Sequence, residues 1–136
     1  MTIILFTVPG HPVGKARPRF TRSGHAYTPE KTASFENLVK LAAKNAMRDL
    51  APIEGSVSAE VISSFPVPAS WSKKKRQAAL NGEVMPTVKP DADNVAKAVL
   101  DAINGICYAD DSQVVTLHIE KRYSATPLTV VRITDD

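Results

Sequence analysis

The apolar residues of this chain change their spacing repeatedly, and this change restricts the folds that the chain can adopt. Some segments carry an apolar residue at every second position, as a strand with one buried face does. Others carry apolar residues three or four positions apart, as a helix does. The predicted elements, in order, are a strand over 2–8, a helix over 29–50, a strand over 56–66, a short helix from Ser70 or Ser72 to Leu80, a helix over 93–105, and strands over 113–123 and 128–133.

This order, β-α-β-(α)-α-β-β, predicts an α+β fold in which helices pack on a small mixed β-sheet. The chain has 136 residues, a length that suits one domain over 1–136. Thr28 is the expected N-cap of the helix that begins at Pro29, because proline is favoured at the first helical position.

Composition excludes several classes of protein. No run of about 18 apolar residues occurs, so the sequence excludes a membrane-spanning helix. The apolar first residues lack the basic region and the cleavage site of a signal peptide. Cys107 is the only cysteine, so no intramolecular disulfide can form, and cysteine and histidine show no zinc-binding spacing. These features predict a cytoplasmic protein.

Charge is distributed unevenly along the chain. Residues 1–50 contain eight Lys or Arg and three Asp or Glu, whereas residues 89–136 contain five and eight. The basic residues gather in two runs, which consist of Lys15, Arg17, Arg19 and Arg22 in the first and Lys73, Lys74, Lys75 and Arg76 in the second. Such asymmetry indicates a polyanionic partner, and these side chains are the candidate contacts to DNA phosphates.

The first basic run lies in a loop over 9–28 that is rich in glycine and proline. This loop leaves room for a short hairpin around Phe20 to Tyr27. The two aromatic side chains could stack on nucleic-acid bases or pack in the protein interior, and the sequence leaves both roles open.

An acidic cluster carries the main chemical signal. Asp91 and Asp93 precede Lys97 by a few residues, and the pair Asp110 and Asp111 follows after a helical segment. Carboxylates that gather without balancing positive charge repel one another, which indicates a cation between them. Mg²⁺, or Mn²⁺ in its place, prefers oxygen ligands of this kind. A hard-metal site beside a basic surface is what phosphodiester hydrolysis in nucleic acid requires.

Structural roles are open for the same residues. Asp91 or Asp93 could cap the helix over 93–105, and Lys97 could form surface ion pairs with Asp93 or Asp101. The pair at 110 and 111 could belong to a polar turn. The aspartates can meet within one chain only if the strand after them begins near the start of that helix, which the short connection 106–111 permits without requiring it.

Two groups of motifs resemble those of the RusA-type Holliday-junction resolvases. The close resemblance consists of Lys89-Pro-Asp91-Ala-Asp93-Asn94, Lys97, Leu100-Asp101-Ala102 and Tyr108-Ala-Asp110-Asp111-Ser-Gln113-Val-Val. A looser resemblance covers Gly14-Lys15-Ala-Arg17-Pro18-Arg19-Phe20 and Tyr27-Thr28-Pro29. Ala92 and Ala16 depart from the residues usual in that family, and neither change removes a candidate functional group.

This resemblance implies a homodimeric, Mg²⁺-dependent endonuclease that nicks four-way DNA junctions symmetrically. It implies that Asp91, Asp93 and Asp111 are metal-binding catalytic residues and that Lys97 is the essential lysine. Asp110 is a weaker candidate beside the metal ligands, and Asp101 is expected to be structural. Val114, Val115 and the final strand are candidates for the dimer interface.

Two other functions remain open on the residues alone. One is a DNA-junction-binding module that does not cleave and whose acidic cluster holds a structural ion. The other is a Mg²⁺-dependent hydrolase of nucleotides, against which the long basic segment argues, because a small substrate does not need it.

Overall fold

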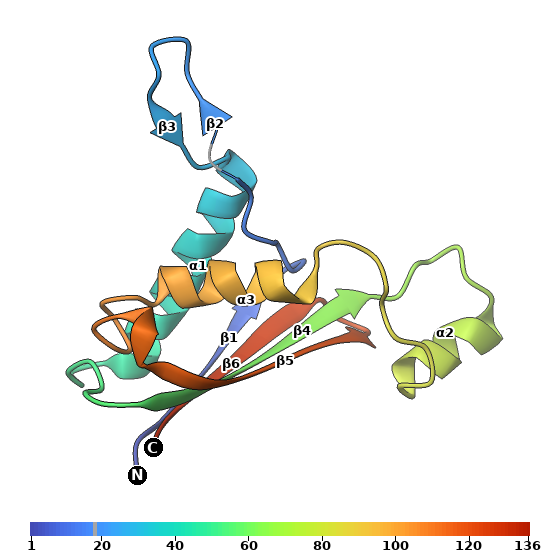
Figure 1. Ribbon diagram of the computed structural model, residues 1–136. Helices are drawn as coiled ribbons and strands as arrows, with labels where there is room; N and C mark the ends of the chain where they lie inside the picture. Colours follow the sequence, from blue (N-terminus) through green and yellow to red (C-terminus); the bar gives the residue numbers. More distant parts are fainter. Residues whose placement is uncertain (18) are drawn as a thin grey trace.

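The computed structural model describes residues 1–17 and 19–136 of the chain. Within these residues a four-stranded sheet, three α-helices and a small hairpin form the fold (Figure 1). In chain order the elements are β1 (Ile3–Pro9), β2 (Arg19–Phe20), β3 (Ala26–Tyr27), α1 (Glu30–Met47), β4 (Val57–Pro66), α2 (Lys73–Leu80), α3 (Ala92–Ala102), the 3-10 turn η1 (Asp111–Gln113), β5 (Val114–Ser124) and β6 (Leu128–Asp135). Pro18, part of the looser motif, lies outside the described residues.

The sheet is mixed, with strand order β1-β6-β4-β5. Strand β6 is antiparallel to both of its neighbours, and β4 and β5 are parallel. A parallel pair needs a crossover connection, which α2 and α3 supply. The predicted fold class and element order are therefore confirmed. The final strand offers no free edge for a dimer interface, because both of its edges are paired within the sheet.

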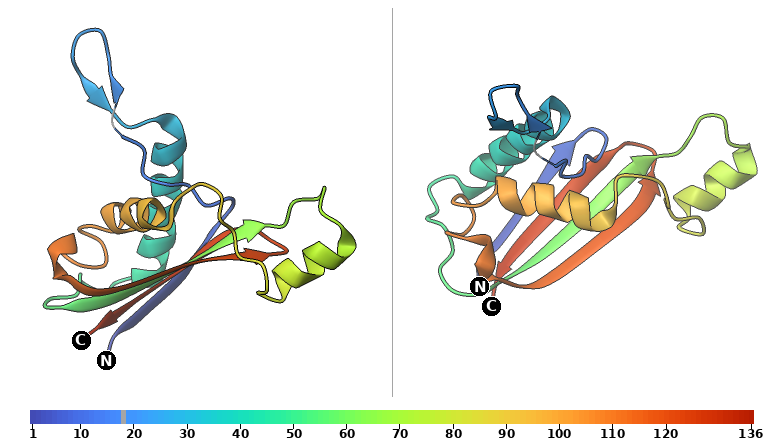
Figure 2. Two further views of the ribbon diagram at one scale, coloured as in Figure 1. Left: turned by 45° about the vertical axis from the view of Figure 1, so that its right-hand side comes forward. Right: turned by 45° about the horizontal axis from the view of Figure 1, so that its top comes forward.

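Helices α1 and α3 cover one face of the sheet (Figures 1 and 2). Alternate residues of a strand point to the same face, and Ile4, Phe6 and Val8 of β1 are buried toward these helices. The buried stripes facing them consist of Phe35, Val39, Ala43 and Met47 in α1 and Val95, Val99 and Ala102 in α3. Burying each large apolar side chain stabilises the fold by about 1.5–3 kcal/mol, so this layer fixes how α3 lies on the sheet.

None of the helices in the described residues has the length and apolar composition needed to cross a membrane.

Helix α1 differs from its prediction at both ends. Pro29 occupies the N-cap position in extended backbone, with φ −51° and ψ 143°, so Thr28 lies one residue too early to cap the helix. The helix ends at Met47 rather than at residue 50, because Arg48 adopts a positive φ of 52° that an α-helix cannot continue. By contrast, Ser72 caps α2 as predicted, its side chain accepting a hydrogen bond from the Lys75 amide at 3.2 Å.

Helix α3 ends at Ala102, three residues before its predicted end, because the chain turns back there. Gly105, with φ +80°, donates its amide to the Tyr108 carbonyl at 2.8 Å. The Tyr108 hydroxyl donates to the Leu100 carbonyl at 2.9 Å and so satisfies one of the free carbonyls of the last helical turn. Burial, reinforced by the nearby charge of Asp111, raises the pKa of Tyr108, so its hydroxyl keeps the proton that it donates.

Replacing Tyr108 by Phe is expected to lower the free energy of unfolding by about 1–3 kcal/mol, because the Leu100 carbonyl then lacks its buried donor. Urea denaturation followed by circular dichroism measures this change. Tyr123→Phe is the matched control. It removes the hydroxyl of another buried tyrosine, for which no hydrogen-bond partner is found among the described residues, and it should change stability by less than about 0.5 kcal/mol. Equal effects of the two substitutions would contradict the assigned role of Tyr108.

Candidate active site and nucleic-acid interface

Two free carboxylates lie at the N-terminal end of α3. Asp91 occupies the N-cap position, yet its side chain accepts no capping hydrogen bond. Among the described residues neither Asp91 nor Asp93 forms an ion pair, and both are exposed. Because the capping role is not filled by Asp91, both carboxylates are available to a ligand.

At the other acidic pair the two residues differ in role. Asp110 caps η1, where its side chain accepts a hydrogen bond from the Ser112 amide at 3.2 Å. The Gln113 side chain closes the capping box by accepting from the Asp110 amide at 2.9 Å. The hydrogen bond from Ser112 lowers the pKa of Asp110. Asp111 is exposed and takes no part in this cap, so it is the free carboxylate of the pair.

The two groups of carboxylates lie at opposite ends of α3. The helix has eleven residues, a length of about 16 Å, and the turn held by Tyr108 returns the chain beside its C-terminal end. Strand β5 therefore begins near the C-terminal end of α3 and away from Asp91. The three aspartates could meet within one chain only if this strand began near the start of the helix, and it does not. In the part of the chain that the structure describes, no three Asp, Glu, His or Cys side chains lie close enough to hold a metal ion. One protomer alone does not fit a metal bound by Asp91, Asp93 and Asp111.

Lys97 lies on the exposed side of α3 between these two ends. Its side chain is 62% exposed, and its ammonium group lies 3.3 Å from a carboxylate oxygen of Asp101. The alternative partner Asp93 is not paired with it. The same oxygen of Asp101 lies 3.4 Å from Lys15, so Asp101 makes the ion pair expected from its spacing and joins two lysines.

Lys15 connects the basic loop to both helices. Its ammonium group donates a hydrogen bond to Glu36 of α1 at 2.6 Å and also contacts Asp101 of α3. Burial by itself lowers the pKa of Lys15, but Glu36 and Asp101 together outweigh it and raise the pKa above its ordinary value. In the free protein Lys15 is thus engaged in protein contacts, and its predicted contact to DNA stays a prediction.

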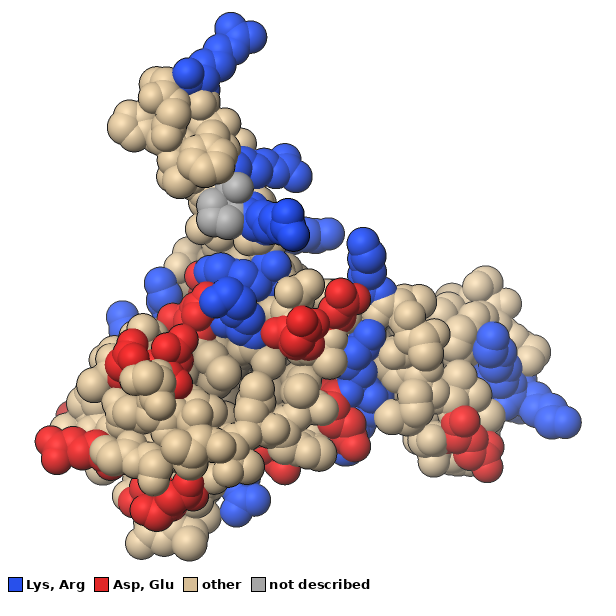
Figure 3. Space-filling view, viewed as in Figure 1, with Lys and Arg blue, Asp and Glu red and all other residues tan. Residues whose placement is uncertain are grey.

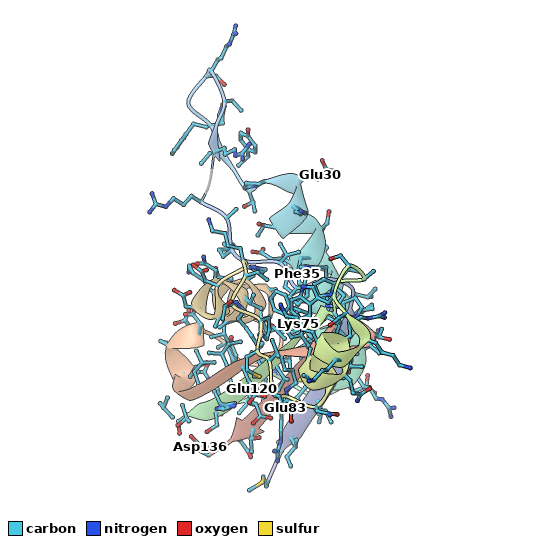
Figure 4. The ribbon with its side chains drawn as sticks, turned by 90° about the vertical axis from the view of Figure 1, so that its right-hand side faces the viewer. Glu30, Phe35, Lys75, Glu83, Glu120 and Asp136 are labelled. Carbon is cyan, nitrogen blue, oxygen red and sulfur yellow. The ribbon has the colours of Figure 1, made fainter. Side chains whose placement is uncertain are left out.

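Residues 19–28 form a hairpin that projects from the body, and together with residues 15–17 they are called the arm below (Figures 1 and 4). Strands β2 and β3 pair Arg19 with Tyr27 and Phe20 with Ala26. Both aromatic side chains are exposed, Phe20 to 71% and Tyr27 to 46%, so the packed role left open by the sequence is wrong. The basic side chains on the described part of the arm that are also exposed are Arg17, Arg19 and Arg22.

The root of the arm is packed against the start of α3. The Lys15 amide donates to the Asn94 carbonyl at 2.8 Å. A Cβ atom at Gly14 would lie 3.0 Å from the Cβ atoms of both Pro90 and Asn94, so a side chain at position 14 would push these segments apart. The position of the arm is therefore coupled to that of Asp91.

A groove of about 630 Å³ runs between the root of the arm, the start of α1 and the residues before α3. Its charged lining consists of Lys15, Arg19, Lys31, Lys89 and Asp91. Lys31 and Lys89 were not among the predicted DNA contacts. Lys89 adjoins the acidic motif and could have been found there, whereas Lys31 belongs to a helical surface and joins the groove only through the tertiary fold.

The second basic run forms α2, beyond the ends of β4 and β5. Lys75 lies over the ring of Trp71, with its nitrogen 3.9 Å from the ring centroid. Trp71 in turn packs edge-on against Tyr123, with the ring centroids 5.3 Å apart. In Figure 3, basic side chains project from the arm and from the α2 end of the molecule, and most acidic ones lie on the body, with a further acidic group at the α2 end.

We expect the pKa of Lys15 to lie above its ordinary value of about 10.5 and to fall in Glu36→Gln, because burial then acts with less opposition. NMR titration of ¹³C-labelled lysine measures both values. Since the folded-state pKa is raised, the stabilisation is present below the ordinary pKa and is lost as pH rises through the raised one. Glu30→Gln, at the start of the same helix (Figure 4), should leave the Lys15 pKa unchanged. An unaltered pKa in Glu36→Gln would refute this assignment.

Comparison with known proteins identifies the family of this chain. Residues 9–134 match the family model described as "Endodeoxyribonuclease RusA". The chain is also 44% identical over 138 residues to the uncharacterized protein YqaN of Bacillus subtilis (strain 168), in an alignment that covers 98% of this chain and 96% of YqaN. The match includes the arm, α3 and the acidic residues at both of its ends. This chain therefore belongs to the RusA family of endodeoxyribonucleases.

Proposed function

We propose that this protein is a Mg²⁺-dependent endonuclease that resolves four-way DNA junctions by paired, symmetric nicks and that it acts as a homodimer. The observation that carries this proposal is the placement of three free carboxylates at the two ends of one helix. Asp91 and Asp93 lie at the first end and Asp111 at the second, and neither set alone supplies three ligands.

A second protomer can complete the ligand set. A two-fold axis beside the middle of α3 reverses the direction of this helix in the partner. The partner's Asp111 then comes to the end of α3 that carries Asp91 and Asp93, and the reciprocal contact forms at the other end. Two equivalent sites result, which suits a substrate with two equivalent strands to cut.

The surface beside α3 supports this arrangement. Strand β5 lies at the edge of the sheet and runs opposite to α3 (Figures 1 and 2). Its side chains Val115 and Leu117 are 63% and 45% exposed. An edge strand with exposed apolar residues is a surface that proteins cover by association. Val115, which was predicted as an interface residue, therefore remains a candidate for the dimer interface.

When bound, Mg²⁺ supplies neutralisation of phosphate charge and a lowered pKa of water at the scissile bond. Lys97 adds a positive charge one helical turn from Asp93, and its exposed ammonium group can contact the phosphate as negative charge develops. Asp101 restricts where that ammonium group lies. The groove between the arm and α3 holds the neighbouring phosphates through Arg19, Lys31 and Lys89.

DNA reaches both sides of the acidic end of α3 in this proposal. The arm contributes Arg17 and Arg22 beyond the groove, and α2 contributes its exposed basic residues on the opposite side. Lys75 contacts Trp71 in the free protein, so Lys73, Lys74 and Arg76 are the members of that run whose charges are more available to phosphates.

Subunit mixing tests the shared site. Asp93→Asn and Asp111→Asn should each reduce Mg²⁺-dependent nicking of a synthetic four-way junction by about 100-fold or more. Co-expressed, the two variants should regain activity, because each mixed dimer has one site that receives only wild-type ligands. With random pairing, about a quarter of the wild-type sites are intact, and the products should be single rather than paired nicks.

Asp110→Asn provides the control for this experiment, because asparagine keeps the capping function that the structure assigns to Asp110. It should nick at close to the wild-type rate. No recovery in the mixed sample would refute the shared site. Junction binding without cleavage in any divalent metal would instead favour the non-catalytic binding module.

The salt dependence of binding tests the phosphate contacts of the arm. In Ca²⁺, the slope of log K against log[salt] should become less steep by about 0.9 for each arginine of the arm that is replaced by alanine. Fluorescence anisotropy measures the DNA affinity of Arg17→Ala and Arg22→Ala, alone and combined. Arg132→Ala on β6 is the control. A shallow slope of log K against log[salt] that does not change when the arginines of the arm are replaced would contradict this DNA path. It would indicate a small nucleotide substrate.

A further inference from the structure

We infer that Phe20 is a base-stacking residue that enters the centre of the junction and gives the protein its preference for branched over duplex DNA. This inference rests on the proposed function and concerns a residue outside the nicking chemistry. It begins from the exposure of Phe20. A phenylalanine contributes to folding when it is buried, but 71% of this side chain is exposed.

The two faces of the arm differ in a way that leaves the Phe20 ring open. Neighbouring residues of a strand point to opposite faces, and the register places Arg19 beside Tyr27 on one face and Phe20 beside Ala26 on the other. Because Ala26 is small, nothing on the opposite strand covers the ring. The ring is therefore free to stack on a flat partner.

The charge of the segment selects the partner. Residues 9–29 contain four Lys or Arg and no Asp or Glu. Such a segment repels the same segment of another copy and attracts a polyanion. An exposed aromatic ring among arginines is the combination that binds single-stranded nucleic acid, where the rings stack on bases and the cations contact phosphates.

Base faces are available only where stacking is interrupted. Inside an intact duplex both faces of each base pair are covered by neighbours, so Phe20 has nothing to stack on there. At the branch point of a junction the strands change partners, and a base face opens when the protein holds the arms apart, so a ring can cover it there. Phe20 thus favours the branch point over the arms of the junction.

The hairpin is held firmly enough to act as a wedge. At its tip the Thr21 amide donates to the His25 carbonyl at 2.9 Å, and the Gly24 amide donates to the Thr21 carbonyl at 3.0 Å. At its root the Ala16 amide donates to the Thr32 hydroxyl at 3.3 Å, beside the contact of Lys15 with Asn94. The hairpin and its root are thus each ordered before DNA binds, which reduces the entropy lost on binding.

Equilibrium binding in Ca²⁺ tests the inference without requiring cleavage. Anisotropy is measured on a four-way junction and on a duplex of the same sequence, for wild type, Phe20→Ala, Phe20→Leu and Phe20→Trp. Phe20→Ala should reduce the ratio of junction to duplex affinity by about 5- to 150-fold, the range for one base–aromatic stack. Phe20→Leu should also reduce this affinity ratio, because leucine has no ring to stack, whereas Phe20→Trp should keep the ratio of the wild type. Leu38→Ala, an exposed apolar residue of α1, is the control and should leave the ratio unchanged.

A second readout places the ring. With 2-aminopurine at the branch point, wild type and Phe20→Trp should lower its emission on binding, because an aromatic ring stacked on the open base face quenches it, and Phe20→Ala should not. With the probe inside one arm of the junction, no protein should change it. An unchanged affinity ratio in Phe20→Ala, or equal losses for junction and duplex, would overturn the inference.

Sedimentation of Phe20→Ala in the absence of DNA should match that of the wild type. A different sedimentation coefficient would also overturn the inference, by showing that the ring contacts protein. A wild type with no preference for the junction overturns the proposed function and this inference with it. By contrast, the wild type could prefer the junction without nicking it, and Phe20→Ala could remove that preference. This result would count against the nuclease proposal and support the role of Phe20.

Discussion

The packing of α3 against the sheet is the constraint on which the site depends. Buried side chains such as Val95 and Val99 hold the helix in one orientation, and the contact of Tyr108 with Leu100 turns the chain back at its end. Because both contacts are buried, the separation of Asp91 and Asp93 from Asp111 is a property of the core rather than of a loop. Any chemistry that needs all three carboxylates must therefore bring a second copy of the helix.

The ion-pair network of Lys15 extends this constraint to the DNA-binding surface. Glu36 lies on α1, Asp101 lies on α3, and Lys15 joins them from the root of the arm. The arm, the groove and the acidic end of α3 are thus linked through one ammonium group and the packed position of Gly14. In the proposed function, this linkage relates the DNA contacts of the arm to the carboxylates of α3.

Elements with a long, regular apolar pattern were predicted well, since their spacing reflects which face is buried. Helix ends were predicted less well, because they depend on the backbone angles of single residues. Pro29 takes the N-cap position that Thr28 was expected to fill, and Arg48 stops α1 three residues early. The free carboxylates at Asp91 and Asp111 were among the selected residues. Local spacing did not distinguish Asp110 from Asp111, and only the family resemblance ranked Asp111 first; the capping role of Asp110 became visible in the structure.

By itself the sequence determined the α+β class, the acidic motif with its lysine, the basic segments and the family, because these depend on residue type and local spacing. Only the tertiary structure decided which of those residues lie together. It placed the aspartates at opposite ends of α3, engaged Lys15 with two acids and brought Lys31 into the groove. The reason is physical. Spacing along a chain sets the face on which a side chain lies, but the distance between two elements is set by what the core between them must bury.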